Sequence, residues 1–297
     1  MAKPLNAVLG TFFFQFWILF MGLAGYMFYR LIAYRESWNI ALFVVTMILQ
    51  LKYGKSEAFI KFQLWFNIME WFDKREIVEM EKPKKNNSMF CFHPHGIYSM
   101  GMVHNLYTKN TFFENLIVLS SRFALSIPFS GLLLTLFGLE GVHPENLTKL
   151  LKKGSNVGIM VGGFEEATLT KYGENRVYIK ERKGFIKYAL RYGTTIYPVF
   201  TFGENNMFYT YNGFQSLRLW LNKFKLIGTI YWSRFFTVPE PNIEMITVCG
   251  KGIELPKIEN PSKEDVDKYH QIYIQGLKEL YDTYAPKYAP KVPLQIY

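Results

Sequence analysis

The chain has little cysteine and few of the groupings that hold disulfides or metal ions. Only Cys91 and Cys249 occur among the 297 residues, so no disulfide framework is implied, and a cytosol-facing protein fits that count. Of the five histidines, His93 and His95 form the one close pair, and no third ligand lies at a typical metal-site spacing. We therefore expect no metal site. Internal repeats and low-complexity tracts are also lacking, so the length indicates one large domain or two small ones.

Acidic residues are scarce relative to basic ones, since 24 Asp and Glu stand against 34 Lys and Arg, a net charge of +10. Such a charge favours an acidic partner, namely nucleic acid, anionic lipid headgroups or a phosphate-rich ligand. Aromatic residues make up 18% of the chain, which fits either a large core or a protein at a bilayer interface. The N-terminal residues favour lipid over nucleic acid.

No charged residue lies between Pro4 and Tyr29. As a helix this run is roughly 39 Å long, more than the ~30 Å hydrocarbon core of a bilayer. A cleaved signal peptide would have a shorter apolar region followed by small residues, whereas aromatic residues follow here. A second apolar run, Ser37 to Leu51, comes after a short charged connection, and lysines flank the two runs. We predict a transmembrane helical hairpin over residues 1–51, with both ends in the cytosol.

The remaining residues, 52–297, alternate short apolar runs with helical patterns, which predicts an α/β catalytic domain. Residues 52–87 are expected to form an aromatic, charged helix ending in a polar loop. Phe214–Phe236 mixes aromatic, aliphatic and basic residues, as interfacial amphipathic segments do. The predicted strands are Met89–Phe92, Leu116–Leu119, Val157–Val161, Thr195–Phe202 and Met245–Cys249. The predicted helices are Pro144–Lys153, Gly184–Tyr192 and a long helix capped by Ser262.

The sharpest local feature is the run Phe92-His93-Pro94-His95-Gly96, directly after a predicted strand. Imidazole is the side chain best suited to removing a proton near neutral pH, and a strand-end loop is where a rigid scaffold presents reactive groups. Two other interpretations remain open, a pair of turn histidines bonded to the backbone and a metal pair. We favour acid–base catalysis.

Two further motifs follow predicted elements of the same domain. Val161 to Ala167 contains Gly162 and Gly163, which permit a sharp turn, and Glu166, which can orient an imidazole. The basic pair Arg182 and Lys183 precedes Gly184 at a predicted helix start, where backbone N–H groups and the helix dipole attract phosphate. A solvated carboxylate run and a solvated basic turn are the alternatives for these two motifs.

Taken together and in this order, the motifs resemble the diacylglycerol acyltransferase type 2 family, which includes monoacylglycerol and wax-alcohol acyltransferases. His93-Pro94-His95-Gly96 looks like the family's HPHG signature, and Val161 to Ala167 is similar to its VGGxxE block. Arg182 to Glu204 and Val248 to His270 resemble two further blocks. The resemblance covers roughly residues 5–285. It implies a mixed central sheet flanked by helices, as in glycerolipid acyltransferase catalytic domains.

The resemblance implies transfer of a fatty acyl group from acyl-CoA, a substrate rather than a cofactor, to the hydroxyl of diacylglycerol. On this basis His95 is expected to be the general base, His93 to position the loop, and Glu166 to orient His95. The backbone N–H groups of the glycines would face the oxyanion, and the basic helix start would hold the CoA phosphates. The glycines expected at the oxyanion are Gly96, Gly162 and Gly163. The residues expected to hold the CoA phosphates are Arg182, Lys183 and Gly184.

Several alternatives stay open. The acceptor can instead be a monoacylglycerol or a fatty alcohol, and a membrane-anchored lipid-binding scaffold is the alternative outside enzymes. A lysophospholipid acyltransferase is disfavoured, because no aspartate lies within ten residues after His93 or His95. The expected partners are acyl-CoA, an acylglycerol and the membrane, without nucleic acid, and the oligomeric state is left open. The expected location is the endoplasmic reticulum membrane, with the catalytic domain facing the cytosol, and lipid droplets are allowed as a second site.

Overall fold

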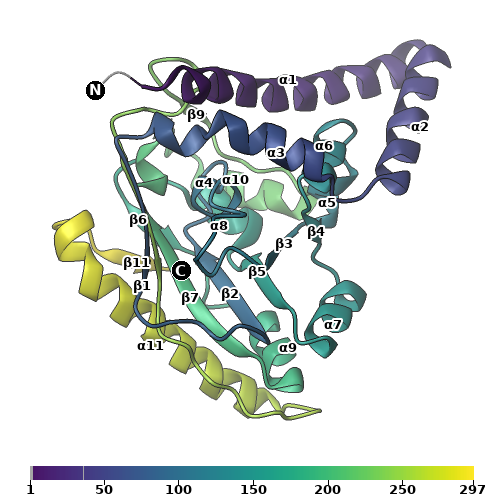
Figure 1. Cartoon of the computed structure of the whole chain (residues 1–297). Helices are drawn as coiled ribbons and strands as arrows, with labels where there is room; N and C mark the ends of the chain where they lie inside the picture. Colours follow the sequence, from purple (N-terminus) through teal and green to yellow (C-terminus); the bar gives the residue numbers. More distant parts are fainter. Residues whose placement is uncertain (1–2, 36) are drawn as a thin grey trace. The chain divides into compact units, whose positions relative to one another are not determined.

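The computed structural model describes residues 3–35 and 37–297. Figure 1 shows the chain coloured from its N-terminus in purple to its C-terminus in yellow. The chain divides into two compact units. The first unit comprises residues 1–71 and 118–143, and the second comprises residues 72–117 and 144–297. The predicted division into a membrane hairpin over 1–51 and a catalytic domain over 52–297 stays a prediction.

The first unit is mainly helical. Its N-terminal helix α1 packs on α3, where Gly10 is essential for the close approach, since a Cβ there would lie 2.5 Å from Cβ of Phe66. Ser56 caps α3 by accepting the N–H of Phe59 at 3.3 Å. The elements are α1 (Leu5–Tyr34), α2 (Ser37–Lys52), α3 (Glu57–Phe66), η1 (Ile68–Trp71), α5 (Arg122–Ser126), α6 (Ser130–Leu136) and β4 (Glu140–Gly141). Strand β3 (Leu116–Ser120) crosses the boundary between the units and pairs in parallel with β4.

Helices thus form over both apolar runs of residues 1–51. Within the described part of the chain, no helix combines the length and the apolar character that crossing a membrane requires. The transmembrane hairpin is not confirmed.

The second unit holds a sheet with helices around it. In chain order its elements are β1 (Lys74–Glu79), β2 (Ser88–His93), α4 (Met100–Val103), α7 (Pro144–Lys152), β5 (Asn156–Met160), α8 (Gly163–Leu169), β6 (Asn175–Val177), α9 (Gly184–Tyr192), β7 (Thr195–Phe202), η2 (Glu204–Asn206), β8 (Tyr209–Thr210), α10 (Gln215–Leu221), η3 (Asn222–Phe224), β9 (Tyr231–Trp232), β10 (Glu244–Cys249), α11 (Lys263–Tyr288) and β11 (Leu294–Ile296).

The strands of its main sheet run in the order β1-β10-β7-β2-β5, and this sheet is mixed, whereas β6 pairs with β11 and β8 with β9 in two small sheets. Strand β10 is antiparallel to β7, whereas β2 is parallel to both of its neighbours, β7 and β5. In the register, His93 lies opposite Phe200 of β7, and Phe92 lies opposite Met160 of β5. The carboxyl ends of these three strands therefore meet at one edge of the sheet. This confirms the predicted α/β class with a mixed central sheet and flanking helices.

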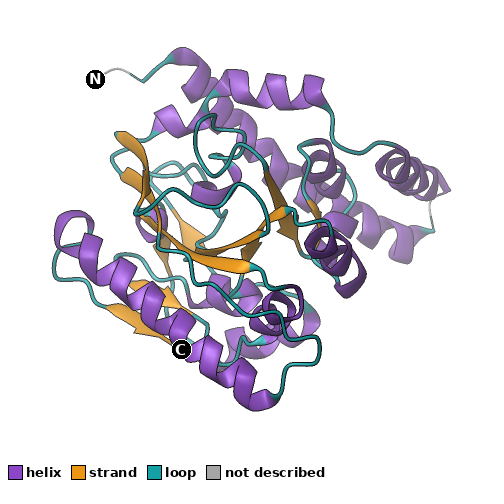
Figure 2. Ribbon diagram, turned by 60° about the horizontal axis from the view of Figure 1, so that its bottom comes forward, coloured by secondary structure: helices purple, strands orange, loops and turns teal. Residues whose placement is uncertain are grey.

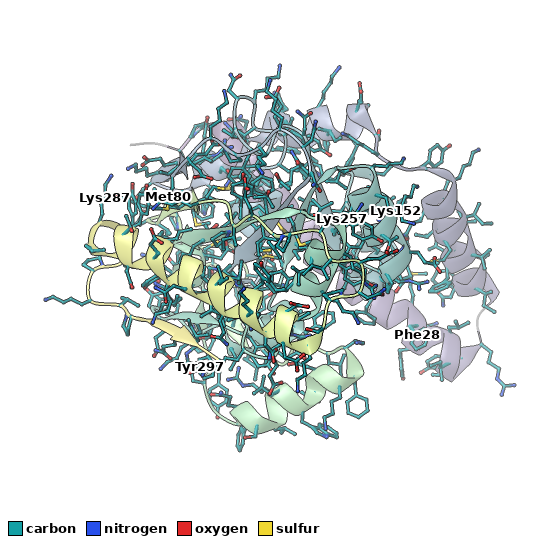
Figure 3. The ribbon with its side chains drawn as sticks, turned by 90° about the horizontal axis from the view of Figure 1, so that it is seen from below. Phe28, Met80, Lys152, Lys257, Lys287 and Tyr297 are labelled. Carbon is teal, nitrogen blue, oxygen red and sulfur yellow. The ribbon has the colours of Figure 1, made fainter. Side chains whose placement is uncertain are left out.

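Aromatic residues fill the core of the second unit. The ring of Phe90 on β2 stacks on Tyr197 of β7 at 5.0 Å and on Phe112 at 4.8 Å between centroids. Helix α11 packs on β7 and β10 and crosses one face of the sheet (Figure 2). It begins at a capping box in which Ser262 and Asp265 exchange hydrogen bonds, as its sequence predicts. Lys287 lies near its far end (Figure 3).

One secondary-structure prediction was wrong. Residues 52–87 do not form a single helix, because α3 ends at Phe66 and β1 occupies Lys74–Glu79. The sequence of β1 is charged, and its side chains are only partly buried. As the edge strand of the sheet it pairs with β10 alone, so it lacks the continuous apolar pattern of a central strand.

Candidate active site

Three parallel strands deliver the candidate site residues to one edge of the sheet. Strand β2 ends at His93, and the loop with His95 and Gly96 follows it. Strand β5 ends at Met160, and α8, which carries Glu166, begins three residues later. Strand β7 ends directly before Gly203 and Glu204. In open α/β sheets, binding sites form at such carboxyl ends.

His93 is buried and bonded at both ring nitrogens. Its Nδ1 lies 3.2 and 3.1 Å from the two carboxyl oxygens of Glu166, and its Nε2 lies 3.0 Å from the hydroxyl of Tyr273 on α11. Because the carboxylate only accepts, Nδ1 carries the proton and Nε2 accepts from Tyr273. Burial raises the pKa of Tyr273 well above its usual range, so this hydroxyl stays protonated and can donate. His93 therefore has no free nitrogen for a substrate.

Glu166 joins three segments of the chain. Besides the ring of His93, its carboxyl accepts the backbone N–H of His95 at 2.7 Å and that of Tyr178 at 2.7 Å. Gly162 makes this close packing possible, since a Cβ there would lie 2.1 Å from Glu166 Oε2. The ring that Glu166 holds is that of His93, whereas the sequence led us to expect that of His95. From His95, the carboxylate of Glu166 accepts the backbone N–H.

His95 is held differently from His93. Its side chain is partly exposed, and its Nδ1 lies 3.1 Å from the carbonyl oxygen of Gly96 and 3.4 Å from Oγ of Ser99. Since a carbonyl only accepts, Nδ1 carries the proton and Nε2 keeps its lone pair. No described residue hydrogen-bonds to Nε2. Removal of water from the partly buried ring is the main cause that lowers the pKa of His95, which favours the neutral form with a free Nε2 lone pair.

Glu204 is a second buried carboxyl under the same loop, and our sequence analysis gave it no role. Its oxygens accept the N–H groups of Met100 at 2.9 Å and Gly101 at 2.8 Å, the first residues of α4. Gly96 has φ of +60°, and a Cβ there would lie 2.6 Å from Cγ of Glu204. Burial raises the pKa of Glu204 to about 7. The signal available in the sequence was its position directly after a predicted strand.

The predicted glycines lie at this edge of the sheet. Gly162 and Gly163 stand at the start of α8, and Gly163 has φ of +57°. Gly96 follows His95 in the loop. Their role as oxyanion donors stays a prediction.

The predicted phosphate-binding residues lie at the start of α9, where each basic side chain pairs with a carboxylate. Arg182 pairs with Glu165, and Lys183 Nζ lies 2.5 Å from Oδ1 of Asp267. Gly184 is the first residue of the helix. A CoA phosphate would therefore compete with two carboxylates for these charges.

Two other features bear on the chemistry. Cys91 on β2 is fully buried, and burial raises the pKa of its thiol, so the side chain does not fit an acyl-accepting nucleophile. In the part of the chain that the structure describes, no three metal-ligating side chains cluster.

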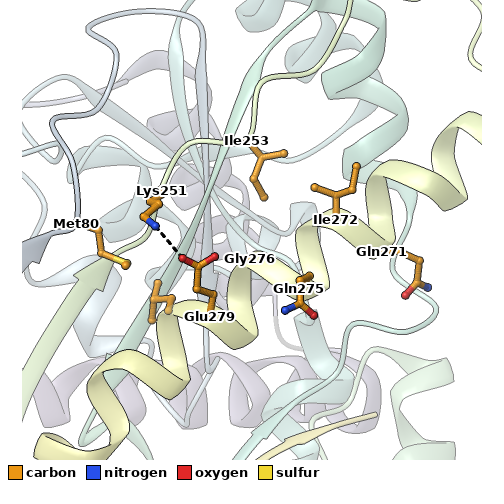
Figure 4. A pocket seen from close by; sticks show the side chains of 9 residues that line it. Met80, Lys251, Ile253, Gln271, Ile272, Gln275, Gly276 and Glu279 are labelled. Atoms are coloured by element: carbon orange, nitrogen blue, oxygen red, sulfur yellow. Dashed lines mark hydrogen bonds and ion pairs between the residues drawn. The ribbon is translucent and has the colours of Figure 1, made fainter.

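A cavity of about 540 Å³ lies along α11, with Lys251, Ile272, Gln275 and Glu279 among its lining residues (Figure 4). Its described lining includes none of the predicted site residues. Lys251 in this lining pairs with Glu279 at 2.8 Å.

The chain that carries His93, His95 and Glu166 is similar to known proteins over most of its length. A family model described as diacylglycerol acyltransferase matches residues 30–296. The chain belongs to this family and is an acyltransferase. Diacylglycerol O-acyltransferase 2 of Dictyostelium discoideum is 32% identical over 249 residues, 77% of this chain and 75% of the relative. Human 2-acylglycerol O-acyltransferase 3 is 30% identical over 250 residues, 74% of this chain and 71% of the relative.

Among solved structures, the 1-acyl-sn-glycerophosphate acyltransferase PlsC of Thermotoga maritima is similar, with a TM-score of 0.45 and 16% identity. The match covers 94% of this chain and 99% of that one.

Proposed function

We propose that this acyltransferase moves a fatty acyl group from acyl-CoA to the free hydroxyl of diacylglycerol, forming triacylglycerol. Membership of the diacylglycerol acyltransferase family supports the reaction class. The observation that carries the mechanism is the difference between the two histidines. His93 is buried and bonded at both nitrogens, whereas His95 is partly exposed and keeps a free Nε2. His95 is the general base of the proposal.

In the proposed reaction, Nε2 of His95 removes the hydroxyl proton of the acceptor as its oxygen attacks the thioester carbonyl carbon. An ester C–O bond forms and the C–S bond to CoA breaks. The proton passes from His95 to the departing thiolate, so the products are the acylated glycerolipid and CoA. A positioned base of this kind contributes about 10²–10⁴-fold in rate.

Glu166 and His93 act in this proposal as positioning residues. Glu166 holds the backbone N–H of His95, and His93 fixes Glu166 from the other side. The backbone N–H groups of Gly96, Gly162 and Gly163 are the proposed donors to the oxyanion. Arg182, Lys183 and the first turn of α9 are the proposed site for the CoA phosphates, which would displace Glu165 and Asp267.

The acceptor is tested directly. Membranes containing the full chain are given labelled oleoyl-CoA with diacylglycerol, monoacylglycerol or a fatty alcohol in turn, and the lipid products are resolved. We expect triacylglycerol as the main product. Faster transfer to monoacylglycerol would overturn the diacylglycerol assignment, and the similarity to 2-acylglycerol O-acyltransferase 3 supports this second candidate. Wax ester as the main product would favour a fatty alcohol.

We also propose that residues 1–51 anchor the chain in the endoplasmic reticulum membrane with both ends in the cytosol. The support is the charge-free run from Pro4 to Tyr29 and the lysines that flank the two apolar runs. Glycosylation tags placed before residue 4 and after residue 285 should both stay unmodified in a secretory membrane. Modification of one tag alone would contradict the hairpin.

A further inference from the structure

A segment of the second unit exposes an unusual number of large apolar side chains. Residues 214–236, here called the docking segment, run from the start of α10 through η3 and β9 to Phe236. Ten of its large apolar side chains are exposed, among them Phe214, Trp220, Phe224, Trp232 and Phe236, the last at 86%. A soluble surface seldom gathers so many, and such patches mark interaction sites.

The charge of the docking segment is of one sign. No Asp or Glu occurs between Glu204 and Glu240 in the sequence, whereas Lys223 and Lys225 flank the exposed Phe224. Both lysines are exposed, and neither makes an ion pair with a described residue. Trp and Phe beside unpaired lysines suit the interface of an anionic bilayer, where rings enter the headgroup region and lysines meet lipid phosphates.

The docking segment is fixed to the element that carries Glu166. Asn222 Nδ2 and the N–H of Gly228 donate to Oγ1 of Thr168 at 2.8 and 3.3 Å, and Thr229 Oγ1 donates to the carbonyl of Ala167 at 2.6 Å. Thr168 and Ala167 belong to α8, directly after Glu166. The position of the docking segment is therefore tied to that of the candidate site.

A further hydrogen bond joins the docking segment to the segment that follows His95. The hydroxyl of Tyr98, three residues after His95, lies 2.7 Å from the hydroxyl of Tyr231 on β9. The rings of both tyrosines also pack edge-to-face against Phe208. The segment that follows His95, through Tyr98, and helix α8, through Ala167 and Thr168, thus both bond to the docking segment.

We propose that residues 214–236 insert into the interface of an anionic bilayer and hold the edge of the sheet that carries His95 at the lipid surface. The insertion itself rests on exposure and charge. Its consequence, that the acyl acceptor reaches His95 from the bilayer, rests on the proposed function.

The test uses the full chain in lipid nanodiscs and a fluorescent label on one engineered cysteine. The native Cys91 and Cys249 are both fully buried, so labelling is confined to the new position. Ile227→Cys reports on the docking segment, and Ile272→Cys on α11 is the matched control, because the two isoleucines are 46% and 41% exposed. Nitroxide-bearing lipids quench a label that enters the bilayer.

We expect quenching at residue 227 to exceed that at residue 272 by about twofold or more in anionic discs. Lys223→Gln with Lys225→Gln should lower the quenching at 227 in anionic discs and leave it unchanged in zwitterionic ones. Equal quenching at 227 and 272 would overturn the proposal, as would cross-linking of two copies through residue 227 without quenching. The quenching test needs no substrate, so a chain that docks in it but does not acylate diacylglycerol in the product assay would contradict the proposed function alone.

Discussion

The inner and outer parts of the candidate site differ in what holds them. The inner part consists of His93 on β2, Glu166 on α8 and Tyr273 on α11, all buried, and the ring of His93 bonds to both of the others. The outer part contains His95, which is partly exposed, and whose ring bonds only to Gly96 and Ser99 of the same loop and leaves Nε2 free. His93 and His95 have the same side chain, but only His95 has a ring nitrogen free to accept a proton. The difference arises from their hydrogen bonds and exposure.

The largest effect is expected at the outer histidine. His95→Ala removes the proposed base, so kcat for acyl transfer should fall by about 10²–10⁴-fold while expression and membrane recovery stay unchanged. Acylation rates with labelled oleoyl-CoA and diacylglycerol measure this. His143→Ala, which alters a histidine of the first unit, is the control. Retention of more than about a tenth of the activity by His95→Ala would contradict the assignment of His95 as the base.

The next effect concerns the acyl donor. Replacing Arg182 and Lys183 with Gln removes two proposed phosphate partners, so the KM for acyl-CoA should rise about tenfold or more. The KM for the acceptor, which has no phosphate, should change little. High salt should weaken acyl-CoA use more in the parent than in the double variant.

A matched variant sharpens this result. Glu165→Gln leaves Arg182 without its carboxylate partner, so it should lower the KM for acyl-CoA. If the double variant instead raises the KM for the acceptor, these residues line the lipid site or support the fold.

A smaller effect is expected in the inner part. Tyr273→Phe removes the donor to Nε2 of His93, and loss of one such bond costs about 1 kcal/mol, so kcat should fall about fivefold. A positioning role predicts that both KM values stay constant. Tyr281→Phe, on the same helix, also loses a buried hydroxyl bonded to Asn175, and it should lower stability without lowering kcat. Equal losses of kcat in both variants would indicate a purely structural role for Tyr273.

The smallest effect is a pH dependence of stability from Glu204. Its folded pKa of about 7 exceeds its usual 4.5, so the folded state binds more protons than the unfolded state between these values. Stability from this group is therefore fully present below about pH 4.5 and is lost as the pH rises toward 7. From pH 5 to 7.5, the Tm of the parent should fall by a few degrees relative to that of Glu204→Gln. Parallel Tm curves would show that Glu204 titrates normally.

Buried central elements were predictable from the sequence, and edge elements were not. The bounds of β7 and α9 were predicted to the residue, because a continuous apolar run and a helix ending at Gly193 each have one reasonable interpretation. Strand β1 was missed, because its charged residues suit an edge strand that pairs on one side only. The pattern of apolar and charged residues within one segment does not show whether that segment forms an edge strand.

The structure brings both predicted histidines and Glu166 together, but the predicted pairing of Glu166 with the ring of His95 was not found. The choice of ring at Glu166 depends on the register of β2 against β5. The role of Glu204 depends in the same way on β7 lying on the other side of β2. Strand order arises from contacts far apart in the sequence, so no single motif contains it.

The bond between His93 and Tyr273 also has a consequence for synthesis. These residues are 180 positions apart. At 5–20 residues per second, a ribosome needs on the order of ten to forty seconds between them. Until α11 has folded against the sheet, Nε2 of His93 lacks the hydroxyl of Tyr273 as its hydrogen-bond partner. The hydrogen-bond network of the candidate site is thus completed near the end of translation, and chains that stop before Tyr273 lack its last constraint.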